Sequence, residues 1–463
     1  MTFHTVLIAN RGEIALRVIE ACRELSLETV AVHSEADADR PYLRLASRTV
    51  CIGPADPRRS YGNVAAVLSA AELTGAQAIH PGYGFLAEDP HFVEVCEDHG
   101  LVFIGPTSRT MALLGDKLAA REAVSAAGVP VLPGGRVPET EAACRELAER
   151  VGFPLLVKPV YGGGGRGVRL VSSPEALLPA ITAARSEARL SAGRDDLYLE
   201  RALASPRHIE VQILAHEGRV IHLGERDCSV QRRHQKLVEE APEPALATTT
   251  RDALCGAALA AAAAVDYRSA GTVEFLVSGD GAFHFIEMNA RIQVEHPVSE
   301  MISGVNLIKE QIRLAAGSGR LPAQEEIAFR GHAIECRINA EDPARGFMPS
   351  CGRVVLDELP TGYGVRVDAA LHNGMVVAPH YDSLLAKVLA WGDDREEARI
   401  RMYTALERFR IRGVATTVEV ARRVVSHPSF REGRLGTGLL DELLEEGAAP
   451  DAAPRSNEGA RRV

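Results

Sequence analysis

The chain has 463 residues, of which 46% are hydrophobic and 25% are charged, a composition typical of a soluble globular protein with several domains. Its formal net charge of −10 argues against nucleic acid or an acidic membrane surface as the main partner. Apolar runs are shorter than a membrane span, the N-terminus does not resemble a signal peptide, and the cysteines are scattered. We therefore expect a cytoplasmic protein without a zinc site or disulfide framework.

The first part of the chain, residues 1–113, alternates short apolar runs with helical patterns, as in TVLIAN, TVAVHS, AQAIHPG and LVFIGP. This rhythm predicts βαβ units and a parallel sheet. The turn after the first strand has one glycine where a dinucleotide-binding fingerprint needs GxGxxG. We therefore expect an α/β domain that does not bind a dinucleotide in the usual way.

A second part, residues 114–320, begins near GPTSRTMALLGDKLAAREAV, which predicts a capped helix carrying Lys117. An insert at about 131–203 contains the run GGGGRG, and AALAAAAAV predicts a buried helix. The third part, residues 330–446, is rich in strand patterns and closes with the helix DDREEARIRMYTALERF. The chain is thus expected to combine α/β and α+β domains, followed by a disordered tail at 447–463.

The segment GTVEFLVSGDGAFHFIEMNARIQVEHP reads as two strands joined by a Ser-Gly-Asp-Gly turn. Symmetric pairing about this turn sets Glu274 opposite Phe285 and makes Glu274 and Glu287 diagonal neighbours. Side chains alternate along a strand, so Glu274, Phe285, Glu287 and Asn289 are expected to share one face. A solvated edge face is the alternative interpretation of this pattern.

Two carboxylates and an amide at this spacing suit a hard divalent cation, Mg²⁺ or Mn²⁺. If the chain stays extended, the same face continues through Arg291, Gln293 and Glu295. Arg291 could then grip a small oxyanion through two hydrogen bonds. Glu295 could act as a base if it stays free of the metal.

Lysine is rare in this chain: of 52 basic residues, the lysines are Lys117, Lys158, Lys236, Lys309 and Lys387. Where lysine persists among so many arginines, a compact ammonium charge is a candidate requirement. Lys236 lies in ERDCSVQRRHQK with Gln231 and His234. Beside a metal–phosphate site, such groups would neutralise charge on phosphoryl oxygens.

The chain resembles the biotin carboxylases of the ATP-grasp superfamily over roughly residues 4–446. The stretches that carry the resemblance are IANRGEIALRVI, HPGYGFLAE, FIGP, LGDK, GGGGRG, PRHIEVQ, ERDCSVQRRHQK, GTVEFL, FIEMNARIQVEHPVSEMI and GHAIECRINAEDP. In this family the glycine-rich loop belongs to a mobile lid over the ATP phosphates, where backbone N–H groups can approach oxygens closely.

The resemblance implies a role for each matching position. Nucleotide contacts are expected from Lys117, Lys158, Gly164, Gly165, Glu200, Arg201, Ala202, Leu203, His208, Gln231 and His234. Metal ligation is expected from Glu274, Glu287 and Asn289, and bicarbonate binding from Lys236, Arg291, Gln293 and the backbone of Val294. Glu295 matches the base that deprotonates bicarbonate, and Arg337 matches the residue that stabilises the biotin enolate.

The resemblance further implies ATP, Mg²⁺ or Mn²⁺, bicarbonate as substrate, and biotin on a separate carrier. The chain contains no Met-Lys-Met biotinylation site, so carrier and carboxyltransferase are expected on other chains, beside a homodimer of this one. An acyl-CoA carboxylase is the expected system, and a two-subunit pyruvate carboxylase is an alternative. Another ATP-grasp ligase and a catalytically quiet paralogue also stay open. Departures from the family pattern include Tyr161, Arg201 and Ala202.

Overall fold

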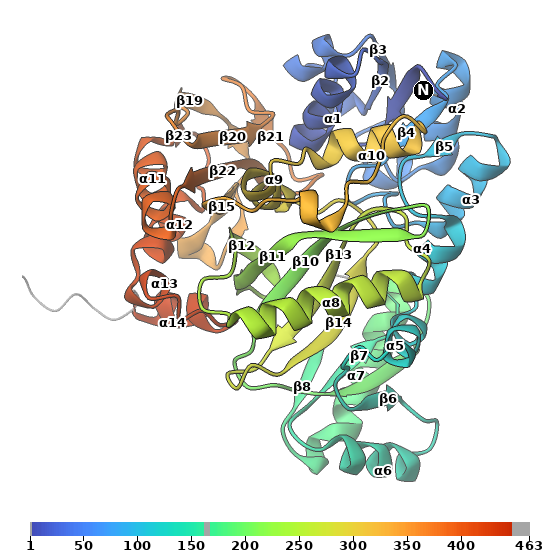
Figure 1. Ribbon diagram of the computed structural model, residues 1–463, viewed down its shortest axis with the longest axis vertical. Coiled ribbons are helices and arrows are strands. Elements are labelled where there is room, and N and C mark those ends of the chain that lie inside the picture. The colour runs from blue at the N-terminus through green and yellow to red at the C-terminus, as the bar shows by residue number, and fades with distance from the viewer. Residues whose placement is uncertain (1, 162–166, 447–463) are drawn as a thin grey trace, which may run out of the picture.

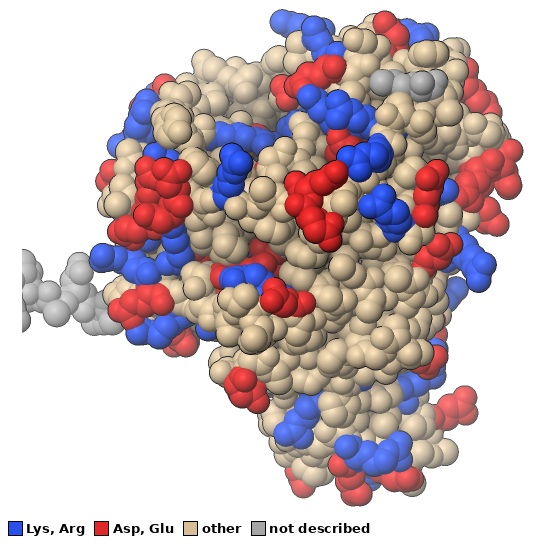
Figure 2. All heavy atoms as spheres, in the orientation of Figure 1, with Lys and Arg blue, Asp and Glu red and all other residues tan. Residues whose placement is uncertain are grey.

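The computed structural model describes residues 2–161 and 167–446, without the side chains of residues 191 and 192 (Figure 1). The predicted lid glycines Gly164 and Gly165 and the tail predicted to be disordered, residues 447–463, lie outside the described residues. Among the described residues, no helix is both long enough and apolar enough to cross a membrane. Basic and acidic side chains are interspersed over the face shown in Figure 2.

The N-terminal region forms the predicted parallel sheet, with strand order β3-β2-β1-β4-β5. Its elements are β1 (Thr5–Ile8), α1 (Gly12–Glu24), β2 (Glu28–His33), β3 (Arg48–Cys51), α2 (Val64–Thr74), β4 (Ala78–His80), α3 (Pro90–Asp98) and β5 (Val102–Phe103). The apolar runs predicted four of these strands. The edge strand β3 was missed because its side chains are largely exposed and carry little apolar periodicity.

A second, larger sheet has eight antiparallel strands in the order β14-β13-β10-β11-β12-β15-β22-β20. The strands are β10 (Arg207–His216), β11 (Arg219–Arg232), β12 (Gln235–Ala241), β13 (Ser269–Val277), β14 (Phe283–Asn289), β15 (His332–Asn339), β20 (Val365–Ala369) and β22 (Leu384–Gly392). The pairing of β12 with β15 joins the second and third parts of the chain into one sheet. The boundary expected near residue 330 therefore separates segments of sequence, but it does not separate sheets.

Helices cover this sheet on both faces. The alanine-rich helix α8 (Thr248–Ala264) crosses β10, β11 and β13, as its composition predicted, and α11 (Arg395–Arg408) packs on β15 and β22 (Figure 1). Helix α9 (His296–Ser303) contacts β11, β12, β15 and β22. Because α9 begins directly after Glu295, its packing places that residue against the sheet.

A smaller four-stranded sheet lies within residues 131–203 and forms the lobe at the bottom of Figure 1. Its elements are β6 (Gly134–Arg136), α6 (Glu141–Val151), β7 (Leu155–Pro159), β8 (Arg169–Val171), α7 (Leu177–Ala192) and β9 (Leu197–Arg201). It has a hydrophobic core of its own, which includes Leu147, Leu155, Ile181 and Leu199. The lobe can therefore be stable as a unit beside the larger sheet.

The remaining helices and strands are short, and most of them belong to the C-terminal region. They are α10 (Leu307–Ala315), β16 (Glu341–Asp342), β17 (Met348–Pro349), β18 (Gly352–Arg353), β19 (Val355–Glu358), β21 (Val376–Val377), β23 (Arg410–Arg412), α12 (Val418–Ser426), α13 (Pro428–Arg431) and α14 (Leu439–Glu446).

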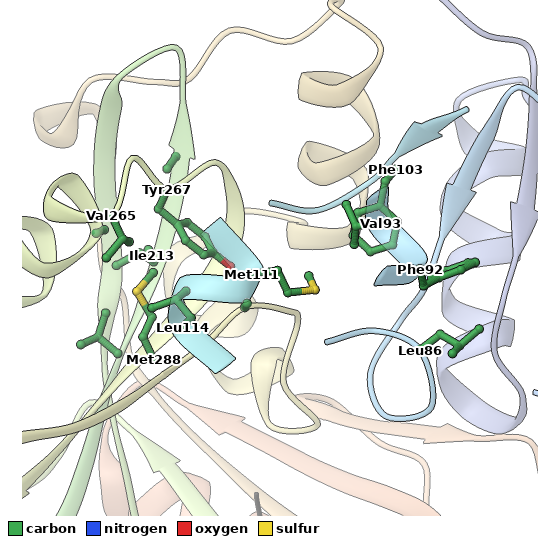
Figure 3. Close-up of a cluster of buried hydrophobic side chains, with 14 of the residues drawn as sticks. Leu86, Phe92, Val93, Phe103, Met111, Leu114, Ile213, Val265, Tyr267 and Met288 are labelled. Atoms are coloured by element: carbon green, nitrogen blue, oxygen red, sulfur yellow. The ribbon is translucent and has the colours of Figure 1, made fainter. Parts of the chain in front are cut away.

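The helix predicted to carry Lys117 is two helices, α4 (Ser108–Gly115) and α5 (Lys117–Ala126). Asp116 has an extended backbone and its carboxylate accepts from the N–H groups of Leu118 and Ala119, so it interrupts one helix and caps the next. Helix α4 also joins the sheets: Met111 lies between Phe103 of the N-terminal sheet and Met288 of the large sheet (Figure 3). Lys117 is thereby the first residue of a helix anchored in this shared core.

The register of the β13–β14 hairpin differs from the prediction. The turn closes one residue later, since Ser278 and Ala282 hydrogen-bond, and the register shifts again between Glu274 and Phe275. Glu274 consequently lies directly opposite Glu287, while Phe285 pairs with Phe275 in the hydrophobic core. The prediction that Phe285 shares a face with the two glutamates was wrong, because it assumed uninterrupted alternation.

Candidate active site

A row of carboxylates crosses three neighbouring strands of the large sheet. Glu210 on β10 pairs with Glu274 on β13, and Glu274 pairs with Glu287 on β14. Like charges directly opposite each other destabilise a sheet unless cations compensate for them. Glu210 belongs to the stretch PRHIEVQ but was missed as a site residue, although its alternation with Ile209 and Val211 marked the polar face.

Lys236 is the cation at the centre of this row. Its Nζ donates to Glu210, to Glu274 at 2.9 Å and to Glu295 at 2.8 Å, which brings together carboxylates from three segments. Burial disfavours the charged amine, but the three carboxylates outweigh it and raise the pKa of Lys236 well above its ordinary value. The buried Arg226 supplies a second cation, through its hydrogen bond to Glu210.

Glu295 is fully buried between two cations. Its two oxygens accept from Lys236 and, at 2.9 Å, from Nη2 of Arg337. Burial opposes ionisation, but Lys236 and then Arg337 outweigh it, so the pKa of Glu295 is lowered and the carboxylate is ionised at neutral pH. The sequence placed Arg337 in a different segment, and it is the β15–β12 pairing that brings it here.

Arg337 also donates through Nε to Glu239, a residue that the sequence analysis missed. Glu239 is fully buried on β12, and burial raises its pKa to about 7 even though Arg337 acts in the opposite direction. The guanidinium of Arg337 is thus held by one carboxylate on each side. These two hydrogen bonds fix the orientation of the Arg337 guanidinium and leave other N–H groups of it available to donate.

Arg291 and Gln293 lie beside the same carboxylates. Arg291 donates to Asn289 at 3.1 Å and to Gln293 at 3.2 Å, and its Nε lies 3.1 Å from Glu88 of the N-terminal region. Gln293 donates to Glu274 at 3.0 Å. The face was expected to continue through these residues only if the chain stayed extended. The condition is not met, since β14 ends at Asn289, but the loop still returns these groups to the site.

The residues predicted to bind metal are adjacent. Asn289 donates to Glu274 at 2.8 Å, and Lys117 donates to Glu287 at 2.7 Å. Lys117 is the main cause of the lowered pKa of Glu287, whereas Glu274 has its pKa lowered by Lys236 and His208 against the effect of burial. Two ionised carboxylates on paired strand positions, with an amide oxygen nearby, form a hard oxygen donor set that fits Mg²⁺ or Mn²⁺.

The residues predicted to contact nucleotide surround this donor set on two sides. Lys158 of β7 and Arg121 of α5 both donate to the buried Glu200 near the end of β9, so the lysine is held within the small sheet. Nε2 of His208 lies 2.8 Å from Glu274, which raises the pKa of His208 against the effect of burial. Gln231 is buried and pairs with Lys236 across the β11–β12 hairpin.

Other predicted nucleotide residues lie at the edges of this region. His234 is exposed in that hairpin turn, with a positive φ of 66°. Arg201 ends β9 and Ala202 follows it, bonded through its N–H to the carbonyl of Pro154, and Leu203 comes next. Among the described side chains, the predicted metal, bicarbonate and phosphate groups therefore lie together, and the predicted adenine residues lie at the end of β9 in the small sheet.

The chain is similar to known protein families along most of its length. Family models match it in order along the chain: the biotin carboxylase N-terminal domain over residues 2–111, the ATP-binding domain of the carbamoyl-phosphate synthase L chain over 116–323, and the biotin carboxylase C-terminal domain over 335–442. The protein named biotin carboxylase from Nostoc sp. is 48% identical over 445 residues, which cover 96% of this chain and 100% of that protein.

Solved structures are similar over the same length. A biotin carboxylase complex with beta-gamma-ATP from Campylobacter jejuni has a TM-score of 0.92 and 44% identity, covering 95% of this chain and 99% of that one. The biotin carboxylase domain dimer of Hydrogenobacter thermophilus 2-oxoglutarate carboxylase, with MgADP and bicarbonate, has a TM-score of 0.93 and 44% identity, covering 96% and 99%. Rhizobium etli pyruvate carboxylase has a TM-score of 0.90 and 41% identity, covering 96% of this chain and 41% of that longer one.

The family models cover nearly the whole chain, and the relative is similar along its full length. The order of a parallel N-terminal sheet, an ATP-grasp region with its small lobe and a strand-rich C-terminal region is the order expected from the resemblance. The chain therefore belongs to the biotin carboxylase family, whose members are ATP-dependent ligases of the ATP-grasp superfamily.

Proposed function

We propose that this protein carboxylates biotin with ATP and bicarbonate, as the first half-reaction of an acyl-CoA carboxylase. The observation that carries the proposal is the position of Glu295, a buried and ionised carboxylate held between Lys236 and Arg337. A base at this position, with cations on both sides, can hold an anionic substrate and remove its proton.

In the proposed first step, Lys236, Arg291, Gln293 and the N–H of Val294 bind bicarbonate beside Glu295. Bicarbonate is a poor nucleophile, and cations are needed to hold it near the anionic γ-phosphate. Glu295 takes its proton, an oxygen of the resulting dianion attacks the γ-phosphorus, and the bond to the ADP oxygen breaks. The products of this step are carboxyphosphate and ADP.

Lys117, which pairs with Glu287, and Lys158, which pairs with Glu200, are proposed to contact the phosphates of ATP. His208, which lies beside Glu274, is proposed to help complete the nucleotide site. Glu274, Glu287 and Asn289 would hold Mg²⁺ or Mn²⁺, which would neutralise charge on the phosphate oxygens. The lid loop with Gly164 and Gly165, together with Gln231 and His234, is proposed to complete the nucleotide site, and residues 200–203 to line the adenine.

The second step uses the other side of Glu295. Carboxyphosphate breaks down to CO₂ and phosphate, and the phosphate takes the proton from the ureido nitrogen of biotin. Arg337 is proposed to stabilise the negative oxygen of the enolate, because its half-buried guanidinium is held in place by Glu239 and Glu295. The enolate nitrogen then attacks CO₂ to give carboxybiotin.

Biotin is proposed to arrive on a separate carrier protein, and a carboxyltransferase on another chain would use the product. The relative from Nostoc, matched along its full length, supports a stand-alone subunit, and the dimer from Hydrogenobacter supports a homodimer. An acyl-CoA is our proposed acceptor; similarity to the biotin carboxylase regions of pyruvate and 2-oxoglutarate carboxylases makes a keto acid the second candidate.

We also propose three domains: an N-terminal biotin carboxylase domain at residues 1–113, an ATP-grasp domain at 114–320 with a lid at about 131–203, and a C-terminal biotin carboxylase domain at 330–446. The proposed function is tested by measuring ADP release from ATP and bicarbonate, with and without free biotin. Biotin-stimulated ADP release together with carboxybiotin is expected. ADP release that is independent of biotin but requires another carboxylate or amine would indicate a different ATP-grasp ligase. The absence of any turnover would indicate a catalytically quiet paralogue.

A further inference from the structure

Lys387 is a lysine that the mechanism above does not use. It lies on β22 and is fully buried, with an exposed fraction of 0%. Its Nζ donates to the carbonyl oxygen of Val294 at 3.0 Å and lies 3.1 Å from Glu13 of α1. Asp368 on β20 is a third partner at 3.8 Å. A buried ammonium needs such partners, and these come from separate parts of the chain.

The bond to Val294 is the one that reaches the proposed bicarbonate site. This carbonyl belongs to the peptide that joins Val294 to Glu295, and Glu295 precedes the first turn of α9. Val294 is proposed to bind bicarbonate, and Glu295 to deprotonate it. A donor at this carbonyl therefore restrains the backbone from which both groups project.

Lys387 and Arg337 are direct cross-strand partners on β22 and β15. Arg337 donates to the carboxylate of Glu295, while Lys387 donates to the carbonyl just before it. Two cations side by side on one sheet face repel each other. Here each has its own acidic partners, Glu239 for the arginine and Glu13 for the lysine, so the arrangement is sustained.

We propose that Lys387 is a positioning residue of the bicarbonate site, which holds the carbonyl of Val294 so that the peptide leading into Glu295 keeps its orientation. The inference rests on the proposed function. It assigns Lys387 no contact with substrate. Its effect reaches the substrate through the backbone of Val294 and the direction of the Glu295 side chain.

The test compares Lys387→Met, which keeps the chain length but removes the donor, with Glu13→Gln and Asp368→Asn, which remove its acidic partners and leave the carbonyl bond intact. For Lys387→Met we expect the KM for bicarbonate to rise about 10- to 100-fold, the loss typical of a charged hydrogen bond. The KM for ATP should stay within about twofold, because the nucleotide side makes no contact with this lysine. Both control variants should keep the bicarbonate KM of the parent protein.

A second readout is independent of turnover. Bicarbonate added with MgADP should raise the Tm of the parent and of both controls, and it should raise that of Lys387→Met much less. If Lys387→Met is recovered unfolded, Lys387→Gln replaces it, since its shorter amide keeps a polar group beside Glu13 but falls short of the carbonyl.

The outcomes separate the inference from the function on which it rests. A parent protein without bicarbonate-dependent ADP release overturns both. An active parent with an unchanged bicarbonate KM in the folded Lys387 variant overturns the inference alone. Equal rises in bicarbonate KM in all three variants would also overturn it, because the lysine would then act only by stabilising the buried charges.

Discussion

Replacing Glu295 with glutamine is the most direct test of the proposed chemistry. Glutamine has nearly the same shape but cannot accept a proton at neutral pH. General base catalysis commonly contributes 10²–10⁴-fold to a rate, so we expect biotin-dependent ADP release and carboxybiotin formation to fall together by about that factor. Both products should fall because neither forms unless bicarbonate is first activated.

The same substitution has a stability cost that follows from the structure. Glu295 accepts one charged hydrogen bond from Lys236 at 2.8 Å and one from Arg337 at 2.9 Å. Glutamine retains one acceptor oxygen, and its NH₂ group would face a cation that has only donors to offer. One of the two bonds is therefore lost, which corresponds to about 1.5–3 kcal/mol at neutral pH.

The stability that the ion pairs of Glu295 contribute depends on pH in a definite direction. The pKa of Glu295 is lowered in the folded protein, so its ion pairs contribute stability above the ordinary value of 4.5, and that contribution is lost as the pH falls through the folded-state pKa. The difference in unfolding free energy between parent and Glu295→Gln should be largest near neutral pH and should shrink in acid. Turnover of the folded variant within tenfold of the parent would refute the assignment of Glu295 as the base.

The remaining predictions concern three other positions. Arg337→Ala should reduce carboxybiotin formation by about 10²–10³-fold and ADP release by less, and equal losses of both products would contradict its role on biotin. Glu287→Gln should abolish bicarbonate-dependent ATP hydrolysis, because it removes a proposed metal ligand and the partner of Lys117; near-normal turnover with Mg²⁺ would exclude it as a ligand. Tyr161→Phe removes the hydrogen bond that Tyr161 donates to Asp116 at 3.0 Å, the residue that caps α5. The KM for ATP should rise about 2- to 10-fold with little change in kcat, and an unchanged KM would show that this bond does not position the helix.

The sequence was sufficient to predict which kinds of groups meet in the site. Glu274, Glu287 and Asn289 lie on one hairpin, so a local pattern was enough to bring them together. Their register was not predictable in the same way. It depends on a turn one residue longer than expected and on a shift between Glu274 and Phe275, and both are small differences in backbone energy that apolar alternation does not record.

Contacts between distant segments were the other limit. Glu239 was missed, and the closeness of Arg337 to Glu295 was unexpected, because these contacts depend on β12 pairing with β15 far along the chain. Glu210 was missed because its cations, Arg226 and Lys236, lie on other strands, β11 and β12. A buried glutamate on a strand looks in the sequence like any polar residue on an exposed face. Its role becomes visible only when the sheet places a cation beside it.

The paired charges also explain why lysine persists at these positions in a chain so rich in arginine. Lys117 and Lys236 each neutralise carboxylates of the row, at Glu287 and Glu274 respectively, while a compact ammonium can turn toward another oxygen without the fixed geometry of a guanidinium. If they bind anionic substrate oxygens, as proposed above, those carboxylates have to be neutralised in another way. We infer that binding of the divalent cation with nucleotide would provide that neutralisation, so that the positive charge needed for bicarbonate is exposed when the phosphate it must attack is already in place.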